Sequence, residues 1–242
     1  MTRFERITQN FFQRFGILVR KYNAGTSESL RRVKLLEKYD VDMLLDVGAN
    51  TGQYTQSLFD NGYTGRVVSF EPLSSAHALL SKTASGNSRW TIAPRCAVGA
   101  SNGNTTIHIS ENSVSSSLLN MLDSHIEGAH ESKIIGSEEV PVRALDSMSE
   151  LYQTGSKNIF LKIDVQGYEK PVLQGAEKLF TTLRGIEIEM SLVPLYENQQ
   201  WLFEHILHDM HASGFQLMSL SPAFTDLNTG QQLQLNGIFM KP

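Results

Sequence analysis

Residues 44–52 read Leu-Leu-Asp-Val-Gly-Ala-Asn-Thr-Gly, an apolar run that breaks at two glycines. An amphipathic stretch begins directly after Gly52. Glycine lets the backbone turn tightly and approach a ligand with no Cβ in the way, and the free N–H groups at a helix N-terminus face whatever is bound there. The run therefore predicts a strand, a tight turn and a helix that together hold a small ligand.

The spacing of the polar residues narrows the class of ligand. A dinucleotide site requires Gly-x-Gly-x-x-Gly, but Asn50 occupies the middle glycine position here. Glu71 ends the next apolar run, where a carboxylate can accept both hydroxyls of a ribose. Nicotinamide cofactors and S-adenosylmethionine both present such a ribose. The pattern favours an adenosine ligand without pyrophosphate, with an ordinary strand-to-helix turn as the alternative.

From residue 43 onward, short apolar runs alternate with amphipathic stretches, which is typical of an α/β domain with a parallel sheet. Strands are expected at 43–47, 66–71, 92–98, 159–164, 185–190, 215–220 and 236–240. Helices are expected at 52–60, 74–84, 169–182 and 199–213. We expect one α/β domain over residues 40–242, preceded by a basic helical extension over residues 1–39.

An insertion over residues 100–157 separates the third and fourth expected strands. It holds alternating runs at 105–109 and 140–143, which predict a β-hairpin, and a short helix is expected near 118–128. A connection this long is usually functional, so we expect a lid. Its serines could bind a polyhydroxylated acceptor, although a solvated loop is the alternative. The candidate substrate-binding serines are Ser115, Ser116 and Ser117.

The charge is uneven along the chain. The formal net charge is −4, yet residues 1–39 carry nine Lys and Arg against three Glu, a net charge of +6. Apolar residues at helical spacing predict helices over 3–22 and from Ser27 to about Tyr39. This extension could contact an anionic membrane surface or a phosphorylated carrier; the alternative is a solvated helical face.

Bulk properties suggest a cytoplasmic protein. Cys96 is the only cysteine, so no intramolecular disulfide can form. No apolar run approaches the roughly 20 residues that a membrane span needs, and the polar residues Gln9, Asn10, Gln13 and Arg14 interrupt any signal-like core at the N-terminus. We expect a cytoplasmic location, with peripheral contact at the inner face of the membrane as an option and homo-oligomers allowed.

Three motifs in order resemble the FkbM family of methyltransferases. They are residues 45–52, residues 69–72, and residues 161–169 with 172–176; residues 140–146 and 236–241 resemble the family as well. The resemblance implies a class I methyltransferase (Rossmann-like) fold, with a seven-stranded, mostly parallel sheet and an antiparallel last strand. It also implies S-adenosylmethionine as cofactor. The commonest version of the fourth-strand motif has Glu where this chain has Gln166, so we assign no chemistry to that position.

Fold position and the resemblance together indicate the cofactor-binding residues. These are Asp46, Gly48, Ala49, Asn50, Gly52, Tyr54, Glu71, Pro72, Ala97 and Asp164.

Candidates for catalysis stand at the carboxyl ends of the central strands, where ligands bind in open α/β sheets. Asp164 is our first candidate for a base or substrate orienter, and Lys162 points to the same side of its strand. Glu189 is the second candidate base. The alternatives are a structural Lys162–Asp164 ion pair, a helix-capping role for Asp164, and a role for Glu189 as a buried partner of Lys162.

We predict no essential metal. His205, His208 and His211 recur at helical spacing, but the buried stripe of that helix is apolar, so the histidines should face solvent. No cluster elsewhere has metal-ligand spacing.

From the resemblance, we expect O-methylation of a sugar hydroxyl in a glycan, a lipid-linked oligosaccharide or a nucleotide-sugar precursor, with no nucleic-acid partner. Two other classes stay open. One is an NAD-dependent sugar oxidoreductase, and the other is a non-catalytic protein that binds S-adenosylmethionine.

Overall fold

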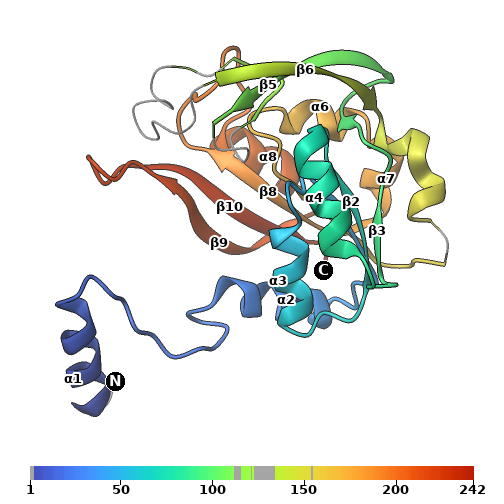
Figure 1. Ribbon diagram of the computed structural model, residues 1–242. Helices are drawn as coiled ribbons and strands as arrows, with labels where there is room; N and C mark the ends of the chain where they lie inside the picture. Colours follow the sequence, from blue (N-terminus) through green and yellow to red (C-terminus); the bar gives the residue numbers. More distant parts are fainter. Residues whose placement is uncertain (1–2, 112–115, 121, 123–133, 154) are drawn as a thin grey trace.

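The computed structural model describes residues 3–111, 116–120, 122, 134–153 and 155–242, which form two sheets and the helices around them (Figure 1). The main sheet has seven strands in the order β3-β2-β1-β7-β8-β10-β9. Its strands are β1 (Met43–Val47), β2 (Arg66–Phe70), β3 (Trp90–Ile92), β7 (Ile159–Ile163), β8 (Leu183–Ser191), β9 (Gln216–Thr225) and β10 (Gln232–Met240).

Strand direction confirms the expected fold class. The pairs β2–β3, β1–β2, β1–β7 and β7–β8 are parallel, whereas β10 runs antiparallel to both β8 and β9. Because β10 alone is reversed, β1, β2 and β7 all end at one edge of the sheet.

The two faces of the sheet are covered by different helices. One face packs against α2 (Glu28–Lys38), α3 (Gln53–Asp60) and α4 (Ser74–Ala84); the other packs against α6 (Glu169–Gln174), α7 (Glu177–Thr182) and α8 (Phe203–Ala212). Leu44 of β1 belongs to the first core and Leu45 to the second, and both are fully buried. A strand buried on both faces needs apolar residues at successive positions, which explains the unbroken start of the 44–52 run.

The prediction of a strand over 92–98 is wrong. β3 ends at Ile92, and the next residues in extended pairing are β4 (Ala97–Val98), which belongs to a second sheet. Pro94 lies between them and has no N–H to donate to a strand ladder. The apolar run therefore serves two sheets in turn.

The second sheet has the order β4-β6-β5 and contains the predicted hairpin. β5 (Gly103–Ser110) pairs antiparallel with β6 (Ile134–Arg143), so the alternating runs at 105–109 and 140–143 belong to this pair. Apolar residues of both strands pack against Leu73 and Ala76 at the start of α4. In Figure 1, β5 and β6 lie above the edge where β1, β2 and β7 end. Most of the helix expected near 118–128 lies outside the described residues, and residues 118–120 are not helical.

The helix predicted over 3–22 is too long. α1 (Arg3–Gln13) ends before Gly16, which has a positive φ of 71°, and residues 17–22 are not helical. The second predicted helix is confirmed as α2, and the N–H of Leu30 donates to the Ser27 hydroxyl at its start. Among the described residues, no helix is both long and apolar enough to cross a membrane.

The helix predicted over 169–182 is interrupted, and Asp146 supplies the reason. Its N–H donates to the carbonyl of Gly175, at the end of α6. Its carboxylate then accepts the N–H groups of Lys178 and Leu179 at 2.8 and 3.0 Å, in the first turn of α7. A helix N-terminus has unpaired N–H groups that such a cap satisfies. The cap comes from a distant segment, so local periodicity could not reveal the break.

Gly175 is also a point of close backbone packing, which generates a stability prediction. A Cβ there would lie 1.9 Å from the carbonyl oxygen of Gly99, which is backbone and has little room to move. Overpacking of this kind costs about 1–3 kcal/mol. We expect Gly175→Ala to lower the melting temperature by several degrees, measured by circular dichroism. Gly103→Ala is the matched control, since a Cβ at Gly103 meets nothing within 4 Å; equal melting temperatures for the two variants would contradict this packing.

α2 is tied to the sheet by a buried ion pair. The guanidinium of Arg32 donates to both oxygens of Glu187, at 2.8 and 2.6 Å, and Glu187 also accepts the hydroxyl of Tyr54 at 2.8 Å. Arg32 and Glu187 are 7% and 3% exposed. The second partner of Arg32, Glu28, lies near the surface.

Removing one partner of a buried pair leaves an uncompensated charge, which typically costs about 3–5 kcal/mol. We therefore expect Arg32→Met to lower the free energy of unfolding by about that amount in urea titrations. Adding Glu187→Gln to this variant should recover a large part of the loss, because it removes the buried charge. Glu28→Gln is the control and should cost no more than about 1 kcal/mol. A loss in Arg32→Met no larger than in Glu28→Gln would refute the assignment.

Candidate active site

A cavity opens where β1, β2 and β7 end, below the second sheet. Most of the residues predicted to bind cofactor or substrate line it: Gly48, Ala49, Asn50, Tyr54, Glu71, Pro72, Ala97, Ser116, Ser117, Lys162 and Asp164. Ala97 lines it from β4 and not from the end of a main-sheet strand. Asp46, Gly52 and Glu189 stand behind this lining, and Ser115 lies outside the described residues.

The two glycines of the 44–52 run are required mainly by packing. Gly48 has a φ of +78°, and a Cβ there would lie 1.8 Å from the backbone oxygen of Asp164. Gly52 has a φ of +93°, and its Cβ would press on the ring of Trp90 at 2.8 Å. Both positions therefore need glycine whatever is bound. Gly48 also brings the β1 turn against the end of β7, which closes one side of the cavity.

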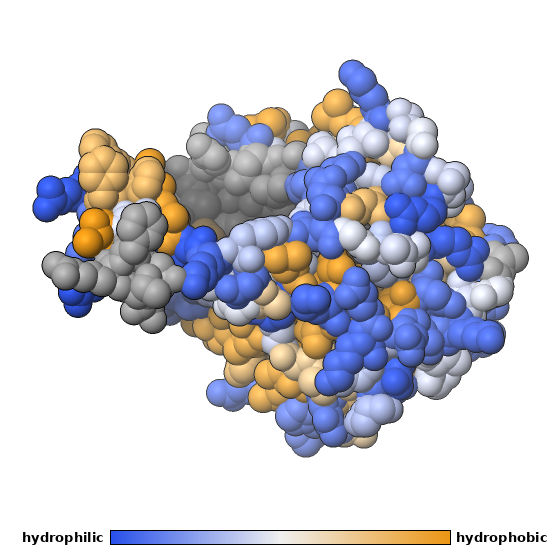
Figure 2. Space-filling view, turned by 90° about the horizontal axis from the view of Figure 1, so that it is seen from below, coloured by the Kyte–Doolittle hydropathy of each residue, from blue (hydrophilic) through white to orange (hydrophobic). Residues whose placement is uncertain are grey.

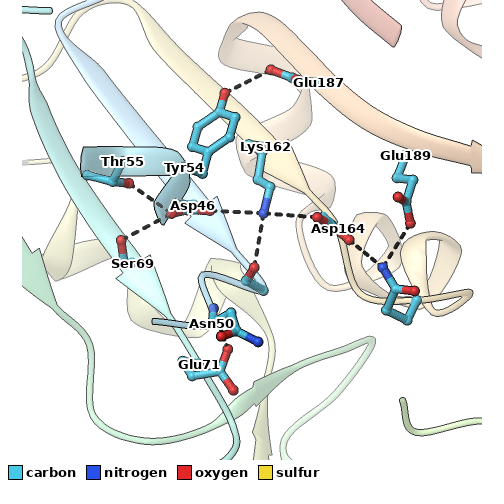
Figure 3. A network of polar contacts seen from close by, with 12 residues as sticks. Asp46, Asn50, Tyr54, Thr55, Ser69, Glu71, Lys162, Asp164, Glu187 and Glu189 are labelled. Carbon is cyan, nitrogen blue, oxygen red and sulfur yellow. Dashed lines mark hydrogen bonds and ion pairs between the residues drawn. The ribbon is translucent and has the colours of Figure 1, made fainter. Parts of the chain in front are cut away.

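Lys162 stands at the centre of the polar network under the cavity (Figure 3). Its ammonium lies 3.2 Å from Asp46 Oδ1 and 3.5 Å from Asp164 Oδ2, and it donates to the carbonyl of Gly48 at 3.0 Å. Burial alone would lower the pKa of Lys162, but the carboxylates of Asp46 and Asp164 outweigh it and raise the pKa above its ordinary value. Lys162 is therefore a permanent cation that orients its neighbours and cannot serve as a base.

Asp46 anchors this network inside the protein. It is fully buried, and its Oδ2 accepts the hydroxyls of Thr55 at 2.8 Å and Ser69 at 3.4 Å. A buried carboxylate is stable only when it is paired. Asp46 thus holds Lys162 in place and reaches the cavity only through it.

Asp164 is the carboxylate that faces the cavity. Its side chain is 36% exposed, in contrast to that of Asp46 at 0%. One oxygen lies near Lys162, and the other accepts an N–H of the Gln166 amide at 2.7 Å. Both predicted roles thus coexist, because Asp164 is ion-paired to Lys162 and also open to a ligand.

Gln166 is a member of the site that sequence analysis left without a role. Its amide nitrogen donates to Asp164 Oδ1 and to Glu189 Oε2 at 2.7 and 2.9 Å, while its amide oxygen accepts the hydroxyl of Tyr196 at 2.6 Å. The backbone is held at a positive φ of 55°. The amide orientation is thereby determined by its partners, and Gln166 bridges two carboxylates that would otherwise repel each other.

Glu189 lies one residue removed from the cavity. It accepts from Gln166 and also from the Gln234 amide at 2.8 Å. Burial raises the pKa of Glu189 well above its ordinary value, and the nearby carboxylates of Asp164 and Glu169 raise it further. A raised pKa favours the protonated form, which cannot accept a proton. Glu189 is therefore suited to positioning Gln166 and Asp164.

Glu71 is the acidic group at the end of β2 and is 4% exposed. Its oxygens accept the N–H groups of Asn50 at 2.7 Å and Leu73 at 2.9 Å. Burial raises the pKa of Glu71 to about 7, although these two hydrogen bonds act in the opposite direction. Each oxygen has a second lone pair that can accept a ligand hydroxyl.

The serines of the insertion are bonded within the protein. Ser117 is 1% exposed, and its hydroxyl donates to the backbone oxygen of Gln166 at 2.7 Å. Ser116 bonds with Ser110 through both backbone and side chain. Ser117 therefore fastens the insertion to the turn after β7, and of the two serines only Ser116 retains partial exposure.

Sequence reasoning missed several lining residues, among them Gln53, Leu73, Ile107, Leu118 and Tyr168. Tyr168 belongs to the same motif as Gln166, so a signal existed for it. The apolar members carry no chemical signal and could be placed only from the fold.

Within the described ranges, no three His, Cys, Asp or Glu side chains are grouped as metal ligands. His205, His208 and His211 are exposed on α8, as expected. The absence of an essential metal stays a prediction.

Comparison with known proteins places this geometry in a family. The model of the methyltransferase FkbM domain matches residues 46–217. Among solved structures, the chain is similar to an rRNA methylase from Streptococcus thermophilus, with 12% identity, a TM-score of 0.46, and coverage of 87% of this chain and 94% of that one. It is also similar to a SAM-dependent methyltransferase from Aquifex aeolicus, with 10% identity, a TM-score of 0.42 and coverage of 86% and 88%.

No curated protein sequence matches the chain. The FkbM domain match begins at Asp46, includes the turn after β1, the end of β2 and the whole β7 motif, and reaches β9. It covers well over half of the chain and all the polar residues that surround Lys162. The chain therefore belongs to the FkbM methyltransferase family.

Proposed function

We propose that this methyltransferase transfers a methyl group to a hydroxyl oxygen of a sugar, in a glycan, a lipid-linked oligosaccharide or a nucleotide-sugar precursor. The observation that carries the proposal is the carboxylate of Asp164, which is open to the cavity yet held between Lys162 and Gln166. A hydroxyl is a weak nucleophile that benefits from a positioned base. The sugar as acceptor is supported by the family resemblance alone.

S-adenosylmethionine is the methyl donor of this family, and it supplies an electrophilic methyl group on sulfur. The lining of the cavity fits it. Glu71 offers carboxylate lone pairs for ribose hydroxyls, and Asn50 and Pro72 flank it. Ala97 and Val98 leave an apolar wall opposite, suited to an adenine ring. These assignments belong to the proposal.

In the proposed reaction, the acceptor hydroxyl lies against Asp164 and loses its proton to that carboxylate as the oxygen–methyl bond forms. Lys162 keeps Asp164 oriented, and Gln166 occupies its second oxygen. Alignment of the acceptor with the methyl group supplies much of the rate acceleration in such transfers. The cytoplasmic location expected from the sequence is part of this proposal.

A labelled-methyl transfer screen tests the acceptor class directly. The purified full-length chain is incubated with S-adenosylmethionine and panels of free glycans, lipid-linked oligosaccharides and nucleotide sugars. Incorporation that resists mild base and maps to a sugar oxygen supports the proposal. Transfer only to nitrogen or to non-sugar hydroxyls would overturn it.

Asp164 provides the sharper test of mechanism. We expect Asp164→Asn to lower kcat about 10²- to 10⁴-fold, the usual contribution of a general base, while affinity for the demethylated product changes little. Glu189→Gln is the matched variant, because Glu189 contacts the same Gln166 amide without lining the cavity. It should lower kcat much less. Normal turnover in Asp164→Asn would remove the base assignment and favour catalysis by alignment alone.

The raised pKa of Glu71, about 7, predicts pH-dependent cofactor binding. Ribose hydroxyls donate to the ionised carboxylate, so affinity should be full above pH 7 and should fall as the pH drops and Glu71 becomes protonated. The limit is about tenfold per pH unit below the pKa. Calorimetry with the demethylated product between pH 6 and 8, values that bracket this pKa, measures the slope.

Glu71→Gln is the control for this pH dependence. It should bind more weakly at pH 8 and lose the slope, because the amide does not titrate. This control also separates Glu71 from Glu169, whose pKa burial likewise raises to about 7 but which does not line the cavity. An unchanged slope in Glu71→Gln would show that another group controls binding.

A further inference from the structure

The segment from Arg6 to Tyr22, here called the N-terminal arm, exposes an unusual density of large apolar side chains. Those more than half exposed are Ile7, Phe11, Phe15, Ile17, Leu18 and Tyr22. Figure 2 shows them as hydrophobic atoms at the left end of the molecule, and Figure 1 shows α1 lying apart from the body. Contiguous exposed apolar surface of this kind usually marks an interaction site.

The arm is organised as an amphipathic element. Ile7 and Phe11 are one helical turn apart on α1, and the ring of Phe15 lies 5.5 Å from that of Phe11, so the three form one ridge. Arg6, Gln9 and Gln13 fall on the opposite side by helical periodicity. The Gln9 side chain donates to the carbonyl of Val19, which folds residues 17–19 back towards α1.

Charge distinguishes the arm from the rest of the molecule. Residues 1–27 carry five Lys and Arg (Arg3, Arg6, Arg14, Arg20 and Lys21) against Glu5 alone, while the whole chain is −4. A second copy of the arm would bring like charges together, which opposes pairing between copies. A surface that complements the arm must be anionic and must also accept apolar side chains.

We propose that the N-terminal arm docks on an anionic phospholipid bilayer. An interfacial amphipathic helix inserts its apolar face at the headgroup boundary and presents Lys and Arg to the lipid phosphates. α1 has only 11 residues, about 16 Å of helix, so it lies in the plane of the interface and does not span the bilayer. The inference goes beyond the proposed function and does not depend on the acceptor.

The arm is joined closely to the catalytic domain. Residues 23–27 connect it to α2, which is held to β8 by the buried Arg32–Glu187 pair. Docking of the arm would thus keep the methyltransferase domain within a few nanometres of the bilayer surface. The tether is short because α2 belongs to the core.

Vesicle co-sedimentation of the full-length chain tests the proposal. We expect binding to vesicles of equal parts phosphatidylcholine and phosphatidylglycerol, weaker binding as salt is added, and little binding to phosphatidylcholine alone. The native Trp90 and Trp201 are buried, at 6% and 9% exposure. In Phe15→Trp, the added indole should therefore shift to the blue and be quenched by brominated lipid, only with the anionic vesicles.

Paired variants separate the arm from general stickiness. Phe11→Ser with Phe15→Ser should weaken binding to anionic vesicles about tenfold or more, because two aromatic rings leave the interface. Leu79→Ser with Leu227→Ser is the control, since both leucines are exposed elsewhere, and it should bind like the natural chain. Melting temperatures check that each variant is folded.

Charge variants complete the test. Arg14→Gln with Arg20→Gln should weaken binding about tenfold or more, whereas Lys82→Gln with Lys170→Gln, both exposed on the domain, should not. Three outcomes would overturn the proposal: no binding to anionic vesicles, equal binding to neutral ones, or equal effects of the arm and control variants. Self-association through the arm in sedimentation velocity, without lipid binding, would assign it to a second copy instead.

Discussion

The ammonium of Lys162 is the charge around which the candidate site is organised. It neutralises two carboxylates that the fold places beside each other on neighbouring strands, Asp46 on β1 and Asp164 just past the end of β7. The third contact, to the Gly48 carbonyl, fixes the turn that follows β1. The strand ends, the turn and the exposed carboxylate are therefore held by one group whose charge the surroundings stabilise.

Residues that contact one another across strands explain where sequence reasoning succeeded. Asp46, Gly48, Glu71 and Asp164 stand at strand ends, and parallel strands bring such ends to one edge. Their proximity could be predicted because it depends only on strand order and direction. The strands and helices near them were also predictable, since each has a clear apolar period.

The failures share a physical origin. The break between α6 and α7 depends on a cap from Asp146, and the use of residues 90–98 by two sheets depends on where Pro94 falls. Ser117 looked available for a ligand, yet it bonds to the backbone of Gln166. Each of these depends on a partner distant in sequence, which no local pattern contains.

Gln166 shows how a departure from the family pattern can be accommodated. A glutamate there would bring a third carboxylate beside Asp164 and Glu189, and like charges so close would require a proton or a cation between them. The amide instead gives two donors to the two carboxylates and one acceptor to Tyr196. The polar cluster is thus satisfied by the protein's own groups.

The long sequence separations in this network have a consequence for synthesis. β1 lies between β2 and β7, and 114 residues separate Gly48 from the lysine that bonds to it. Arg32 waits for a partner 155 residues later. Because the ribosome delivers the chain from its N-terminus at about 5–20 residues per second, one edge of β1 and several buried charges stay uncovered for seconds until β7 and β8 emerge. Nascent chains of this fold are therefore natural clients of factors that shield unpaired strand edges.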